Sequence, residues 1–87
     1  MRYYIDTIEQ VKTEEGGVNE YGARAIQPAD KTFEEVESAY FTKLAAVAND
    51  IGEGENKKHY YMDIKIVNSD GGIEKKDKVG KRVEVNA

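Results

Sequence analysis

Few side chains in this sequence are of the types that carry out catalysis or bind metals. His59 is the only histidine, and cysteine is absent. An HExxH pair, a multi-histidine metal site and thiol chemistry are therefore excluded. His59 stands at the edge of a predicted strand, where we expect a solvated side chain. The remaining carboxylates, tyrosines and lysines form no recognisable catalytic arrangement, so the sequence predicts a protein that is not an enzyme.

A group of carboxylates, Glu34, Glu35 and Glu37, is the next candidate for chemistry. They could form a cation site or an acid-base pair, but their place at a predicted helix start explains them more simply. Negative side chains are stabilising at the positive end of a helix dipole. Thr32 and Glu35 also have the spacing of a capping box. The glycine pairs fall in no phosphate-binding motif, so we expect no cofactor and no metal.

Aromatic and basic side chains on one face of the predicted sheet are a stronger signal of binding. They are Tyr4, Tyr61, Lys65, Lys76 and Lys78. Aromatic rings interleaved with lysines can stack on bases and neutralise phosphates, as in proteins that bind single-stranded nucleic acid. Against this interpretation, the sequence pI is about 5.0 and no RNP-like motif is present. A solvated sheet face is the simpler alternative.

The stretch that organises these residues is a predicted amphipathic helix from Thr32 to Gly52. Apolar residues recur along it at spacings of three and four, which gives one apolar stripe. The stripe consists of Phe33, Val36, Tyr40, Leu44, Val47 and Ile51. Gly52 is the expected left-handed stop. Phe41 lies off the stripe, which makes it a candidate for contact with a partner.

Predicted strands flank this helix on both sides. Before it, residues 2–13 and 18–27 are expected to pair through the glycine-rich turn 14–20, and we place Tyr3 and Ile5 on the core face. A bulge near Thr7 would explain Ile8, which falls on the other face. After the helix, residues 59–68 alternate cleanly, with Met62, Ile64 and Ile66 facing the core, and a tight Asp-Gly turn leads to a last strand over residues 73–85.

The predicted order ββαββ indicates an α+β fold. We expect residues 1–87 to form a single domain, with a four-stranded antiparallel sheet and one amphipathic helix packed on one of its faces. One helix leaves the other face and both edges of such a sheet open, and Ile8, Phe41 and Val67 have no obvious place in the core. Edge pairing or face-to-face dimerisation would cover them, although scattered exposed apolar side chains are also normal.

Charge divides unevenly along the chain. Residues 1–56 carry five basic and twelve acidic side chains, a net charge of −7, whereas residues 57–87 carry eight and five, a net charge of +3. An acidic face of this kind could serve an inhibitor that mimics nucleic acid. No apolar run approaches the roughly 18 residues that a membrane span needs, and residues 1–10 lack a signal-peptide core. We therefore expect a cytoplasmic protein with no membrane partner, although a mature secreted form would have the same features.

Three stretches carry a resemblance: RYYIDTIEQV, TFEEVESAYFTKLAAVAND and YYMDIKIVNSDGGI. Together they resemble small uncharacterised proteins encoded by phages and mobile elements of Firmicutes. The resemblance implies an origin and no functional residues. The sequence thus predicts a small non-enzymatic protein that works by association with a protein partner or with itself, with nucleic-acid binding or mimicry as alternatives.

Overall fold

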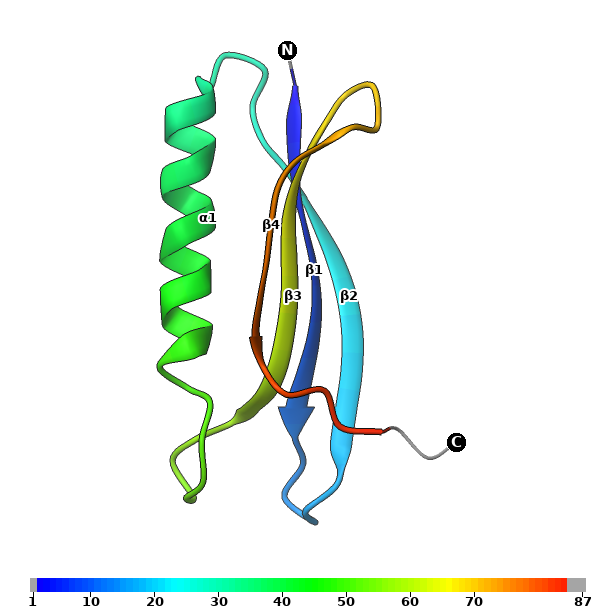
Figure 1. The fold of residues 1–87 in the computed structure, drawn as a ribbon, viewed down its shortest axis with the longest axis vertical. Helices are drawn as coiled ribbons and strands as arrows, with labels where there is room; N and C mark the ends of the chain where they lie inside the picture. The colour runs from blue at the N-terminus through cyan, green and yellow to red at the C-terminus, as the bar shows by residue number, and fades with distance from the viewer. Residues whose placement is uncertain (1, 85–87) are drawn as a thin grey trace.

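A computed structural model describes residues 2–84 and confirms the predicted α+β fold with a ββαββ order. The elements are β1 (Tyr3–Lys12), β2 (Val18–Ile26), α1 (Phe33–Ala48), β3 (His59–Asn68) and β4 (Ile73–Gly80). The strands form one antiparallel sheet in the order β2-β1-β3-β4. Figure 1 shows α1 standing along one face of this sheet.

The helix begins as the sequence predicts and ends earlier. The Thr32 hydroxyl accepts from the Glu35 amide, and the Glu35 carboxylate accepts from the Thr32 amide, which completes the capping box. The C-cap is Asn49, so the predicted stop at Gly52 is wrong. The reason lies in the next residues: Asp50 turns toward His59, and Ile51 forms a bridge with the same residue.

The core lies between α1 and the two central strands. Val36, Tyr40 and Val47 from α1 meet Ile5 from β1 and an alternating set from β3. That β3 set is Met62, Ile64 and Ile66, all fully buried. Burying side chains of this size contributes about 1.5–3 kcal/mol each to the free energy of folding. Their alternation along β3, every second residue, was visible in the sequence.

One prediction about the strands is confirmed and one needs correction. The odd face of β1 meets the core through the buried Ile5. The alternative of a bulge near Thr7 does not hold, because the register shift against β3 lies between Gln10 and Val11, and Ile8 stays on the face away from α1, where it is 44% exposed. The last strand ends at Gly80, not at residue 85, which lies outside the described residues. Gly80 has φ +78, and a Cβ there would meet the carbonyl oxygen of Tyr60, so this position favours glycine.

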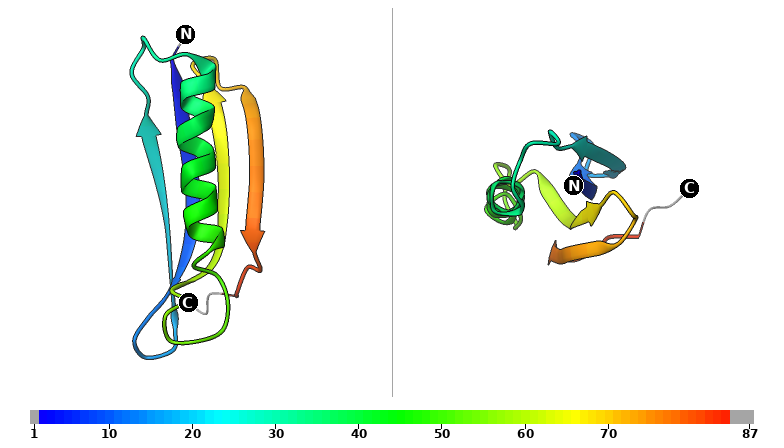
Figure 2. Two further views of the ribbon diagram at one scale, coloured as in Figure 1. Left: turned by 90° about the vertical axis from the view of Figure 1, so that its left-hand side faces the viewer. Right: turned by 90° about the horizontal axis from the view of Figure 1, so that it is seen from above.

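The helix covers only part of the sheet. It packs against β1, β3 and β4, and within residues 2–84 no Cα atom of α1 lies within 8 Å of one in β2. In the left view of Figure 2, α1 stands in front of β1 and β3, while β2 runs separately at one side. Among the described residues no helix is long and apolar enough to cross a membrane.

Candidate functional site

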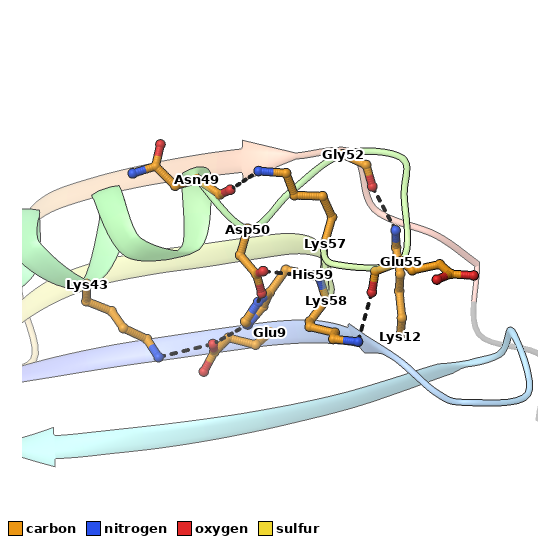
Figure 3. Close-up of polar contacts among 10 residues, drawn as sticks. All are labelled: Glu9, Lys12, Lys43, Asn49, Asp50, Gly52, Glu55, Lys57, Lys58 and His59. Atoms are coloured by element: carbon orange, nitrogen blue, oxygen red, sulfur yellow. Dashed lines mark hydrogen bonds and ion pairs between the residues drawn. The ribbon is translucent and has the colours of Figure 1, made fainter.

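A histidine between two carboxylates lies at the end of α1 (Figure 3). The Nδ1 atom of His59 is 2.7 Å from the Asp50 Oδ2 atom, and its Nε2 atom is 3.0 Å from the Glu9 Oε1 atom. Lys43 Nζ lies 3.2 Å from the same Glu9 oxygen. Glu9 is buried, so these two partners compensate its charge. The expectation that His59 is a solvated edge residue is therefore wrong.

The loop after α1 brings these groups together. Lys57 donates to the carbonyl of Asn49, and Lys12 donates to the carbonyl of Gly52. Lys57 therefore places positive charge at the C-cap carbonyl of the helix, where it is stabilising, and Lys12 ties the following loop to β1. The last turn of α1 itself has no basic residue, so Lys57 supplies that charge from the loop.

This polar cluster has the geometry of a structural clamp. Both ring nitrogens of His59 face carboxylates, which can only accept hydrogen bonds, so neither nitrogen is left for a substrate. The hydrogen bond from His59 holds the pKa of Asp50 below its ordinary value, aided by the Lys58 amide. Within residues 2–84 no group of histidine and carboxylate side chains has the geometry to hold a metal ion.

The open face of the sheet carries the predicted binding residues in cross-strand rows. One row consists of Arg24, Asp6, Lys65 and Lys76, and the next contains Gly22, Ile8, Asp63 and Lys78. Arg24 forms two hydrogen bonds of 2.7 Å with Asp6 and lies over the ring of Tyr4. The Arg24 hydrogen bond is the main cause that lowers the pKa of Asp6.

Tyr61 is on the predicted face but is not exposed. Residues 81–84 leave β4 and cross the open face, as the orange-red end of the chain shows in Figure 1. The backbone of Val83 donates to and accepts from the side chain of Gln10, both at 2.7 Å, and Arg82 pairs with Glu20. Tyr61 is consequently only 7% exposed, so it cannot serve as a stacking platform while this segment is in place.

The three predicted lysines do come together. Lys65, Lys76 and Lys78 line a hollow of about 470 Å³ with Ile73. Asp63 and Asp77 line the same hollow, so its charge is mixed rather than uniformly basic. Such a mixture offers phosphates less attraction than an unbroken basic groove.

Phe41 is half exposed, as its position off the apolar stripe predicts. It packs edge to face against Tyr40, with ring centroids 5.4 Å apart, and the Lys75 ammonium lies 5.0 Å from its centroid. The Tyr40 hydroxyl donates to Asp77 at 2.5 Å, and burial raises the pKa of Tyr40 well above its ordinary value. Phe41 therefore has a structural role in joining α1 to β4, and it is 45% exposed.

β2 is the most exposed of the four strands, and the sequence did not single it out. Every residue of β2 after Val18 is exposed, because within residues 2–84 no Cα atom of α1 lies within 8 Å of one in β2. The crossing segment touches this strand where Arg82 pairs with Glu20. Tyr21 is 48% exposed on the helix side, and Ile26 is 63% exposed on the open face. Among residues 2–84 no strand pairs with the outer edge of β2.

No protein-family model, curated protein or solved structure that was compared with this chain matches it. The resemblance to phage and mobile-element proteins therefore stays a prediction.

Proposed function

We propose that this protein acts by association with another protein chain, without catalysis, and that β2 is its contact element. The observation that carries the proposal is the exposure of β2: every residue after Val18 is exposed, and within residues 2–84 no strand pairs with its outer edge. Monomeric proteins rarely leave a long edge strand of this kind open, because its free N–H and C=O groups invite another strand. A cytoplasmic setting and an origin in a phage or mobile element belong to the same proposal.

The polar cluster supports the non-enzymatic part of this proposal. Glu9 and Asp50 occupy both nitrogens of His59, and a general acid or base needs a free position within reach of its substrate. The cluster instead joins the loop after α1 to β1. Its geometry thus favours a stabilising role.

The acidic-mimic alternative receives less support from the same contacts. Such a mimic needs carboxylates that are free to face a basic partner, but Asp6 and Glu20 are paired with Arg24 and Arg82. Glu9 is buried. These pairs remove much of the acidic surface that the charge count suggests.

Nucleic-acid binding remains the second candidate because Lys65 and Lys76 are direct cross-strand neighbours beside Lys78. Fluorescence anisotropy with a labelled single-stranded oligonucleotide, at low and then rising salt, tests it directly. Salt-sensitive binding that is lost in a Lys65→Gln, Lys76→Gln double variant would favour this candidate. We expect no binding at low salt.

The association proposal is tested by comparing immobilised wild-type protein with an Ala23→Lys variant in capture from the cells that produce it. Ala23 is exposed on β2, and a lysine there blocks the approach of another strand. Ala46→Lys makes the same chemical change on exposed helix surface and is the matched control. We expect proteins that are captured by wild type and by Ala46→Lys to be lost with Ala23→Lys. Capture that is unchanged by Ala23→Lys, together with a self-association state that is also unchanged, would overturn the proposal.

A further inference from the structure

Hydrogen bonding in the sheet determines which β2 residues offer backbone groups to a partner. The Gln27 amide donates to the carbonyl of Tyr3, and the β1–β2 register continues from there without a break. In an antiparallel ladder, hydrogen-bonded and non-hydrogen-bonded pairs alternate. The odd-numbered residues of β2 therefore bond to β1, and the even-numbered residues direct their N–H and C=O groups outward. Those residues are Val18, Glu20, Gly22, Arg24 and Ile26.

We propose that this edge binds the β2 strand of a second copy of the chain, antiparallel, with Gly22 facing the partner's Gly22 across a twofold axis. The inference rests on the proposed function and names its partner. Two four-stranded sheets would join into one of eight strands. Since the axis is perpendicular to the sheet, both helices would lie on the same side.

The side chains of β2 complement one another in this register. Glu20, which pairs with Arg82 in its own chain, lies opposite the partner's Arg24, which pairs with Asp6 in its own chain. Opposite charges therefore adjoin twice by symmetry and extend the two intrachain pairs, and Val18 lies opposite the partner's Ile26 as an apolar pair. On the helix side, Tyr21 lies opposite the partner's Ala23, which places a large ring beside a small side chain. Opposite charges and aromatic or β-branched residues are favourable cross-strand neighbours.

Other registers that keep the outward hydrogen bonds lack this complementarity. A slip by two residues in one direction places Glu20 opposite the partner's Ile26, and a slip in the other direction places Arg24 opposite the partner's Val18. Larger slips place Glu20 opposite the partner's Glu20, or Arg24 opposite the partner's Arg24, and like charges in those positions are destabilising. Charge therefore selects the register centred on Gly22.

The other edge of the sheet does not offer the same opportunity. In β4 the outward backbone groups belong to residues such as Lys76 and Lys78, and a register irregularity lies opposite Ile66 and Val67. Edge lysines and bulges are the usual protection against strand pairing. β2 contains no lysine and no proline, and its two charged residues are complementary to themselves under the twofold axis.

The register is tested by a single cysteine, because the natural chain has none. A Cβ at Gly22 meets only the Thr7 carbonyl, at 3.4 Å, and the backbone there is not in the left-handed region, so Gly22→Cys fits the fold. Paired residues in a ladder have Cα atoms about 4.5–5.5 Å apart, within the range of a disulfide. Under mild oxidation we expect Gly22→Cys to form a covalent dimer about tenfold or more faster than the exposed helix control Ser38→Cys. Equal rates would overturn the register.

A second measurement does not depend on disulfide geometry. In a mixture of isotope-labelled and unlabelled wild-type chains, NMR should detect an intermolecular contact between the α-protons of Tyr21 and the partner's Ala23, which form a close non-hydrogen-bonded pair. Sedimentation equilibrium should show a dimer whose dissociation constant rises about tenfold or more in Ala23→Lys and stays unchanged in Ala46→Lys. A dimer without this contact would overturn the register.

The outcome also separates this inference from the proposed function. A wild-type chain that stays monomeric at millimolar concentration, while β2-dependent capture of a different protein persists, would overturn the second copy as partner and leave protein association standing. If the wild-type chain stays monomeric and no β2-dependent capture occurs, both the second copy as partner and the proposed function are overturned.

Discussion

The two edge strands of this sheet, β2 and β4, differ in how they are attached to the rest of the fold. β4 is joined to α1 by three contacts: Tyr40 donates to Asp77, Phe41 lies beside Lys75, and Glu37 faces Lys75. Within residues 2–84, β2 has no Cα atom within 8 Å of α1. It is held by its ladder with β1 and by the ion pairs of Arg24 and Glu20 at the open face. β4 is thus attached to the helix and packs against the core through Val79, whereas β2 is exposed.

This difference explains why the apolar residues of the two strands have different exposure. Val79 of β4 packs against the core cluster, whereas Ala23 and Ala25 of β2 are exposed on the same face of the sheet. β2 adds little apolar burial to the monomer, so its exposed surface is available for contact with another chain. β2 therefore contributes less to the stability of the monomer and more to its surface.

The largest expected effect comes from placing a lysine on the helix side of each edge strand. Val79→Lys forces a charge toward the core, and we expect a loss of about 3 kcal/mol in the free energy of unfolding. Ala23→Lys points into solvent and should change that free energy by less than about 0.5 kcal/mol. Urea denaturation of both variants measures the two values. Similar losses in the two variants would mean that β2 is buried as deeply as β4.

A smaller effect is expected from removing a single hydroxyl group on the β4 side. Tyr40→Phe leaves the carboxylate of Asp77 without its donor inside the α1–β4 contact, which should cost about 1–2 kcal/mol. Tyr21→Phe removes the same group from the exposed β2 surface and is the matched control, with an expected change below about 0.5 kcal/mol. Urea denaturation again provides the comparison, and a neutral Tyr40→Phe would show that the hydroxyl contact contributes nothing to the attachment of β4.

The local elements of this fold were predictable because each is encoded by neighbouring residues. The capping box at Thr32, the alternation from His59 to Asn68 and the turn at Gly71 all depend on side chains a few positions apart. The fold class followed from their order. The end of α1 was predicted wrongly because it depends on Asp50 meeting His59, and that contact is made by the whole loop.

The surface was harder to predict because distant contacts decide it. Tyr61 has the alternation of an exposed residue, and only the return of Val83 to Gln10 covers it. Two signals were nevertheless present in the sequence. Glu9 and Asp77 fall on the apolar faces of their predicted strands, and a charged residue in such a position indicates a polar partner across the core. The structure supplies His59 and Lys43 for Glu9, and Tyr40 for Asp77.

The smallest expected effect concerns the ion pairs that attach β2 on the open face. Arg24 lowers the pKa of Asp6, and Arg82 lowers the pKa of Glu20, in both cases mainly through a hydrogen bond. A carboxylate whose pKa is lower in the folded than in the unfolded chain contributes stability above its ordinary pKa, and that contribution disappears as the pH falls through the folded value. The ordinary values are 3.8 for Asp6 and 4.5 for Glu20, so the loss should begin below about pH 4.5.

Removing the two arginines should reduce the fall in the free energy of unfolding that begins below about pH 4.5. We expect an Arg24→Gln, Arg82→Gln double variant to be slightly less stable than wild type at pH 7 and to approach it near pH 3, a small difference because both arginines are exposed. The control is Lys76→Gln, which removes a charge whose cross-strand neighbour is Lys65. It should leave the fall in the free energy of unfolding at acid pH unchanged. Urea denaturation between pH 3 and pH 7, at a concentration where the monomer predominates, measures the difference. If the free energy of unfolding of the double variant falls at acid pH as much as that of wild type, β2 is attached by its ladder with β1 alone.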